Sequence, residues 1–128
     1  MYLRAVATLN LHKALVSSTA AGTEIDFNKY FVNPGKREMK AVITAISAGV
    51  GSDSGAIDYK LQESNTTVDS DFSDISGAAI TQTVDTDTNV SEVLHFFTAK
   101  RYLRGYPTVT GGQGWYIVAN VFAVKREA

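Results

Sequence analysis

The sequence predicts an all-β chain that forms one antiparallel β-sandwich of seven to nine short strands, with a jelly roll as one candidate topology. Apolar and polar residues alternate along residues 57–62, which is the period of a strand with one buried and one wet face. Residues 39–46 and 115–124 are apolar on both faces and rich in β-branched or aromatic types, which favours strand over helix. Clusters of Gly, Pro, Asn and Asp separate these runs.

Turn signals place the expected strands in order along the chain. Asn33-Pro34-Gly35 marks a turn before residues 39–46, and the Gly-rich residues 49–55 form a loop after them. The pattern of residues 39–46 suits a central strand that is covered on both faces. The expected strands are residues 9–16, 24–31, 39–46, 57–62, 90–98, 102–110 and 115–124.

Two further features refine the second half of the chain. Residues 59–64 and 72–75 are expected to form a strand–turn–strand unit, and the Asp-, Ser- and Thr-rich residues 69–89 a loop around a short strand at 81–84. Gly111-Gly112 predicts a two-residue hairpin between the last two strands. Pro107 predicts an edge position or a bulge, because proline cannot donate to a sheet.

Composition limits the function. The 128 residues suffice for a single domain with its own core, expected to span residues 1–128. Twelve basic and thirteen acidic residues give a net charge of −1, which argues against direct nucleic-acid binding. The absence of cysteine excludes disulfides and thiolate metal sites. No apolar run approaches the ~18 residues of a membrane span, and Arg4 interrupts any leader, so we expect a soluble protein without a signal peptide.

No catalytic site is predicted. His12 and His95 lie in no known motif, and no Gly-x-Ser-x-Gly elbow is present. Glu24, Asp26 and Glu63 could form a glycosidase-like carboxylate pair, but their spacing does not select that over solvated strand faces. The chain is therefore expected not to be an enzyme.

No cofactor or metal is predicted either. The glycines of residues 49–55 and 111–114 lack the spacing of a phosphate-binding loop. The aspartates of residues 69–87 could supply oxygen ligands to a cation, but the segment lacks the Gly and distal Glu of an EF-hand loop. Whether this region binds a cation stays open.

A basic aromatic segment is the first candidate partner interface. Arg101, Tyr102, Arg104 and Tyr106 belong to residue types enriched in protein interfaces, and they could also stack on bases or sugars. The alternative is an ordinary strand, with Tyr102 and Arg104 on its outer face and Leu103 packed inward.

The N-terminal residues 1–10 are the second candidate. Leu3, Val6 and Leu9 could dock on a neighbouring subunit as an apolar arm. The segment could equally be the first strand of the domain itself.

One combination of motifs resembles a group of small structural proteins of tailed bacteriophages. The motifs are KLQES at residues 60–64, FSDI at 72–75 and KRYLR at 100–104, followed by a Gly-rich hairpin. The resemblance covers about residues 55–124, is looser at residues 24–27, and is broken by the acidic residues 69–89.

The resemblance implies a capsid decoration or cementing protein. Such a protein lies on the capsid surface of the virion after synthesis in the bacterial cytoplasm, binds the major capsid protein, and associates with itself, for which we expect a trimer. Two alternatives remain: a tail or connector component of the same particle, and a carbohydrate-binding or host-attachment module that stacks sugars on Trp115, Tyr102 and Tyr106.

Overall fold

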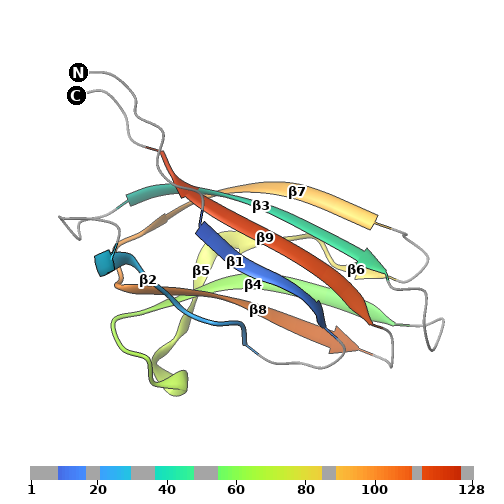
Figure 1. Cartoon of the computed structure of the whole chain (residues 1–128), viewed down its shortest axis with the longest axis horizontal. Coiled ribbons are helices and arrows are strands. Elements are labelled where there is room, and N and C mark those ends of the chain that lie inside the picture. Colours follow the sequence, from blue (N-terminus) through green and yellow to red (C-terminus); the bar gives the residue numbers. More distant parts are fainter. Residues whose placement is uncertain are drawn as a thin grey trace.

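Two antiparallel sheets stack on each other and confirm the predicted β-sandwich (Figure 1). The computed structural model describes residues 9–16, 21–29, 37–47, 55–84, 89–110 and 114–124. These residues hold nine strands and two 3-10 turns. Among them, no helix has the length and apolar character needed to cross a membrane.

Sheet A contains the strands that the sequence makes apolar on both faces. Its strand order is β1 (Leu9–Val16), β9 (Trp115–Ala123), β3 (Arg37–Ser47) and β7 (Asn89–Thr98). The central strand β3 pairs with β9 and β7, so that Ala41 lies opposite both Val121 and Leu94. These strands agree with the expected residues 9–16, 39–46, 90–98 and 115–124 to within two residues at each end.

Sheet B contains the more polar strands. Its order is β2 (Ile25–Asp26), β8 (Tyr102–Thr110), β4 (Ala56–Ser64) and β5 (Ser73–Ala79), and the short β6 (Thr83–Val84) also pairs with β4.

The connections of sheet B include two 3-10 turns. One turn, η1 (Phe27–Lys29), follows β2, and the other, η2 (Asp69–Asp71), lies between β4 and β5. The strand–turn–strand unit predicted for residues 59–75 is confirmed by the antiparallel pairing of β4 with β5.

The predicted Gly111-Gly112 hairpin is wrong. β8 belongs to sheet B and β9 to sheet A, so the chain passes from one sheet to the other between Thr110 and Trp115. A diglycine is a local signal, whereas the inner face of β9 is buried by long-range packing against sheet B. Residues 111–113 themselves lie outside the described part. The prediction for Pro107 agrees with the pairing of β8. At Pro107, β8 pairs with β4 on one side, whereas the described pairs with β2 on the other side involve only Tyr102 and Leu103. Pro107 thus lies where β8 is an edge strand among the described pairs, which suits a residue that cannot donate a hydrogen bond.

The core fills the space between the inner faces of the two sheets. The predicted alternation is confirmed on β4 and β9: Ile57, Tyr59 and Leu61 point inward, as do Trp115 and Ile117. Side chains with almost no exposed surface dominate the core, the largest of them being Trp115, Tyr59, Phe27, Phe96 and Met39.

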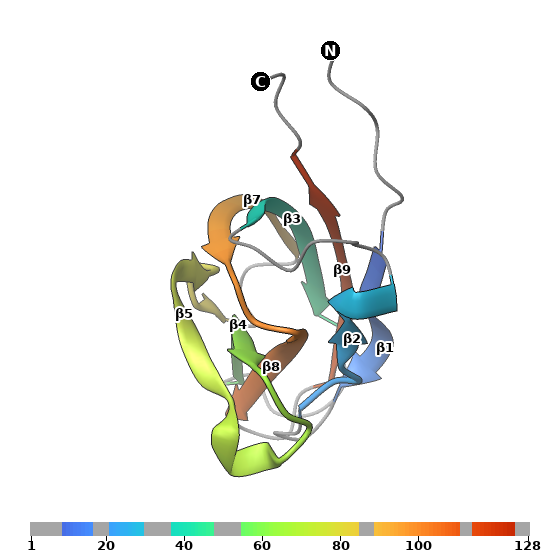
Figure 2. The same cartoon turned by 90° about the vertical axis from the view of Figure 1, so that its left-hand side faces the viewer.

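The two sides of the sandwich are closed by neighbouring strands from opposite sheets. Figure 2 shows β5 beside β7 at one side and β1 beside β2 and β8 at the other. At the β7 side, the backbone N–H of Thr81 donates to the Glu92 carboxylate at 2.9 Å. The closed sides leave two large outward surfaces, one on each sheet.

Candidate protein-binding face

The outer A face, which we define as the side of β3, β7 and β9 that points away from sheet B, carries apolar side chains in contact with solvent. Val93 is 64% exposed, Tyr116 52% and Phe97 50%. All the large exposed hydrophobic side chains of the described residues lie on this face, with the exception of Val68. Exposed apolar side chains are common singly, but a contiguous group marks a site of interaction.

The strand registers show that these side chains are neighbours. Val42 lies opposite Val93 on one side and Asn120 on the other, and Ile46 lies opposite Tyr116. Thr44 lies between Ser91 and Val118, and the Thr44 and Ser91 hydroxyls are 3.1 Å apart. Within β3, β7 and β9 these three rows contain no charged residue, and we call them the neutral half of the face: Val42, Thr44, Ile46, Ser91, Val93, Tyr116, Val118 and Asn120. On the neighbouring strand β1, Lys13 pairs with Val118 and extends the Thr44 row.

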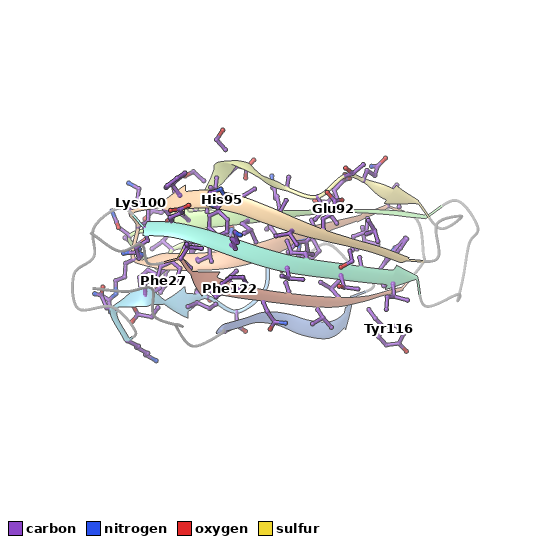
Figure 3. The ribbon with its side chains drawn as sticks, turned by 90° about the horizontal axis from the view of Figure 1, so that it is seen from above. Phe27, Glu92, His95, Lys100, Tyr116 and Phe122 are labelled. Atoms are coloured by element: carbon purple, nitrogen blue, oxygen red, sulfur yellow. The ribbon has the colours of Figure 1, made fainter. Side chains whose placement is uncertain are left out.

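The ionisable residues of the face on β3 and β7 lie at its other end. Lys40 is opposite His95 and Phe122, and the His95 Nε2 is 2.6 Å from a Glu38 carboxylate oxygen. Figure 3 shows His95 and Phe122 toward one end of the sheet and Tyr116 at the opposite end. The face is thus divided along the strands into a charged end and a neutral half.

The apolar pattern of the sequence explains how this face arises. Residues 39–46 and 115–124 are apolar on both faces, which predicted strands covered on both sides. The structure covers only the inner side, with sheet B. The signal that could have identified the site is therefore the double apolar pattern itself, interpreted as burial against another molecule.

Arg104, one of the predicted interface residues, is buried on the corresponding outer face of sheet B. Its Nε donates to the Gln62 side-chain oxygen at 2.9 Å, and its Nη1 donates to Asp69 at 2.7 Å. The guanidinium lies over the Phe72 ring at 4.0 Å from the centroid and 5.6 Å from that of Tyr106. Because Arg104 is only 6% exposed, it has little surface left for a partner.

The network continues to the edge of sheet B. The Gln62 amide donates to Asp74 at 2.9 Å, and Lys60 Nζ donates to the other Asp74 oxygen at 3.0 Å. The hydrogen bond from Gln62, together with Lys60, lowers the pKa of Asp74 below its ordinary value. The polar groups that the sequence places on the outer side of β4 and β8 are thus bound to one another.

Arg101, a second predicted interface residue, lies in the segment that connects β7 of sheet A to β8 of sheet B and fixes it to β2. Its guanidinium makes a bidentate pair with Asp26 at 3.0 Å for each bond, and its backbone carbonyl accepts from the Phe27 N–H at 2.8 Å. Hydrogen bonding from Arg101 lowers the pKa of Asp26. Tyr102 lies 4.9 Å from the Arg101 guanidinium, so this pair is partly exposed but tied to β2.

A buried arginine supports the same connection from sheet A. Arg37 donates to the backbone carbonyl of Lys100 and lies over the Phe27 ring at 4.5 Å. Burial lowers the pKa of Arg37, and the nearby Glu63 carboxylate opposes that shift. Glu63 also accepts a hydrogen bond of 2.6 Å from the buried Thr98. Sequence analysis missed this cluster, because its members are far apart along the chain.

The predicted N-terminal arm is described only in part. Leu3 and Val6 lie outside the described residues. Leu9 begins β1, where it pairs with Val121, so the segment from Leu9 onward is a strand of the domain.

The carboxylates and the histidine considered for catalysis or metal binding lie apart and contact other residues. Asp26 binds Arg101, Glu63 binds Thr98, and His95 binds Glu38 on the outer A face. Asp71 accepts from the Thr66 hydroxyl at 2.6 Å, whereas Asp69 and Asp74 bind Arg104 and Gln62. The described residues contain no group of three or more His, Asp or Glu that could hold a metal ion; Asp85 and Asp87 lie outside them.

The aromatic residues suggested for sugar stacking do not form an open platform. Trp115 is fully buried in the core. Tyr106 is partly buried, with the cations of Arg104 and Lys60 each 5.6 Å from its ring centroid. The large exposed hydrophobic side chains of the described residues are instead concentrated on the outer A face.

A comparison with models of known protein families and with curated protein sequences finds no match to this chain.

Proposed function

We propose that this chain is a virion structural protein that binds and stabilises a bacteriophage capsid shell. The observation that carries the proposal is the outer A face, a contiguous apolar surface left exposed by a sandwich whose other polar and apolar groups are largely satisfied internally. Such a face is the expected property of a subunit that works inside a larger protein assembly. The resemblance of residues 55–124 to small phage structural proteins suggests that this assembly is a phage particle.

The proposed role is mechanical. Two stacked sheets and the ties at Arg37, Arg101 and Arg104 give a rigid body, which can connect shell subunits without ordering itself at the moment of binding. The partner is the major capsid protein, together with further copies of this chain. The proposal assigns no reaction and no cofactor to the protein.

Purified particles provide the test. We expect the protein to be present in particles of its phage, on the head, and to rebind in regular copy number when added to particles assembled without it. Particles that lack it should release their DNA at a lower temperature than complete particles, and added protein should restore the difference. Absence of the protein from purified particles would refute the proposal, and a location on the tail would favour a tail or connector component.

A further inference from the structure

We propose that a shell subunit binds at the edge of β1, by adding an extended segment of its own chain to sheet A as a fifth strand. The inference rests on the proposed capsid role and names what is recognised in the partner, which is its main chain. Three observations carry it: the direction of the β1 backbone groups, the condition of the other sheet edges, and the position of charge on β1.

A hydrogen bond at one end of sheet A fixes the direction of every backbone group in its ladders. The N–H of Val124 donates to the Glu38 carbonyl at 2.8 Å, so these two residues form a hydrogen-bonded pair in the register of β3 and β9. Such pairs recur at every second residue of an antiparallel ladder. The backbone groups of Val118 therefore bond to β3, and those of its neighbour Ile117 bond to β1 on the opposite side.

The same alternation identifies the outward groups of β1. Ile117 lies opposite Ala14, so Ala14 bonds to β9. Lys13 and Leu15, on either side of Ala14, direct their N–H and C=O groups away from β9. Although β2 and β8 lie beside β1 in the opposite sheet (Figure 2), none of the described backbone hydrogen bonds joins them to Lys13 or Leu15. An extended backbone presents donors and acceptors at the same repeat, and can satisfy both residues together.

The other long sheet edges are covered or blocked. β7, at the far edge of sheet A, is flanked by β5, and its Glu92 accepts from the Thr81 N–H at 2.9 Å. In sheet B, the Gly105 carbonyl accepts from the Gly22 N–H, so the backbone of Pro107, two residues further along β8, faces the same edge. Proline has no N–H to offer a partner there. β1 contains neither proline nor glycine, and is therefore the described edge best suited to accept a strand.

The charge on β1 selects a different protein over a second copy of this chain. Two β1 edges related by a two-fold axis pair antiparallel, with Lys13 opposite Leu15 or opposite the other Lys13. The two lysines then lie directly opposite or at the diagonal distance of about 7–8 Å on one face. A lysine on an edge strand discourages pairing with an identical strand for this reason. A strand of another protein can instead carry a carboxylate next to Lys13, which is a favourable cross-strand pair.

An added strand would also continue the outer A face. Lys13 extends the row of Val118 and Thr44, and a fifth strand would lie about 4.8 Å beyond β1 in the same rows. Its alternate residues would then lie beside the apolar face. The expected shell segment is therefore extended, apolar at alternate positions, and acidic near Lys13.

Hydrogen exchange tests the direction of the backbone groups. In the free protein, we expect the amides of Lys13 and Leu15 to exchange about 100-fold faster than those of Ala14 and Val16, which bond to β9. On particles assembled without the protein and then loaded with it, the amides of Lys13 and Leu15 should become protected. Slow exchange of these two amides in the free protein would show that this chain already covers the edge, and would overturn the inference.

Matched substitutions separate the backbone from the side chain. Lys13→Pro and Leu15→Pro each remove an outward N–H, whereas Lys13→Ala and Leu15→Ala keep it. Each proline variant should bind particles about 10-fold more weakly than the alanine variant at the same position, which is the loss expected for one hydrogen bond. Ala14→Pro removes a bond to β9 instead, and should lower the unfolding temperature more than Lys13→Pro does. Circular dichroism shows whether each variant still folds.

The outcomes distinguish this inference from the proposed function. Equal binding of the proline and alanine variants would overturn the added strand and leave the capsid role intact. Failure of the natural protein to bind particles would remove both. A dimer in solution that Leu15→Pro dissociates and Leu15→Ala does not would place a second copy at the edge, and would overturn the choice of a shell subunit.

Discussion

The two outward surfaces of this sandwich reverse the usual relation between polarity and exposure. On sheet B, Gln62 and Arg104 are polar and almost completely covered, whereas on sheet A, Val93 and Tyr116 are apolar and lie mostly in solvent. The two surfaces differ in what covers them. The outer side of sheet B is covered by its own chain, because the turn that carries Asp69 and Phe72 folds onto it and contacts Arg104 (Figure 1).

The comparison indicates how the chain divides its two faces between folding and assembly. A polar network that closes on itself contributes to the stability and rigidity of the monomer, because each buried group has a partner. An apolar face that stays exposed contributes nothing to the monomer and is available for association. Substitutions on sheet B should therefore change the free energy of unfolding, and those on the outer A face should change assembly.

The largest effect on stability is expected at Arg104. Arg104→Ala removes the donors to Gln62 and Asp69 and the cation over Phe72, and leaves Gln62 buried with one bond fewer. Loss of a buried, charge-assisted network of this kind costs about 2–3 kcal/mol of unfolding free energy. Urea denaturation at neutral pH measures the change.

Two variants control for charge in the Arg104 experiment. Arg104→Lys keeps the positive charge but cannot reproduce the planar fork, and should lose about half as much. Lys60→Ala removes an exposed cation from the same side of the sheet and should cost less than about 0.5–1 kcal/mol. Equal losses for Arg104→Ala and Lys60→Ala would show that the outer side of sheet B is an ordinary solvated surface.

The second prediction compares the two faces of one strand of sheet A. Val121→Thr places a hydroxyl in the core and should destabilise the fold by about 2 kcal/mol, because the new group loses its water. Val118→Thr makes the same change three residues away on the outer A face, where the expected change is within about 0.5 kcal/mol. Thermal or urea unfolding of dilute protein, where the monomer dominates, gives both values. A cost of 2 kcal/mol at Val118 would mean that this chain itself covers the face.

The third prediction concerns the backbone that brings Asp74 into the network. The pairing of β4 with β5 shifts between Lys60 and Gln62, and in that interval Gly77 has a φ of +74°. An added methyl group would meet no atom within 4 Å, so Gly77→Ala carries a conformational cost only. That cost is about 1 kcal/mol in the left-handed region. The exposed Ser76→Ala, one residue earlier, should change the unfolding free energy by less than about 0.5 kcal/mol; a similar loss in both would contradict the backbone argument.

Local patterns predicted the strands and the sandwich class, but not which of the two sheets each strand joins. Period-two alternation along β4 and the apolar runs of β3 and β9 gave the elements and the inward faces, since each depends only on neighbouring residues. The diglycine before Trp115 predicted a hairpin for the same local reason, and failed because the sheet to which β9 belongs is decided by its long pairing with β3.

The candidate sites show the same limit. The sequence gives Arg104 as a basic residue on an outer face, which is correct, but its partners Gln62 and Asp69 are 42 and 35 residues away along the chain. No spacing rule connects them. Conversely, the sequence shows that β3 and β9 are apolar on both sides, and one of these sides is the outer A face. A sequence cannot tell whether that side is covered by the same chain or by another molecule.

The smallest expected effect is the pH dependence of the Asp74 contribution. Gln62 and Lys60 bind the ionised carboxylate and lower its pKa, so the stabilisation is complete above the ordinary aspartate pKa of about 3.9 and is lost as the pH falls through the lower folded value. Asp74→Asn should therefore be less stable than the natural protein by at most about 1 kcal/mol at pH 7, because the site is largely exposed.

That deficit should shrink between pH 7 and pH 2, because protonation of Asp74 brings both proteins toward a neutral side chain at this position. The other carboxylates titrate in both proteins and cancel in the difference, which chemical denaturation at the two pH values measures. Val118→Thr on the outer A face is the matched control, because it introduces no titrating group and its small difference should be the same at both pH values. A deficit of Asp74→Asn that does not change with pH would mean that the outer side of sheet B is held by shape alone, and would remove the electrostatic part of the contrast between the two faces.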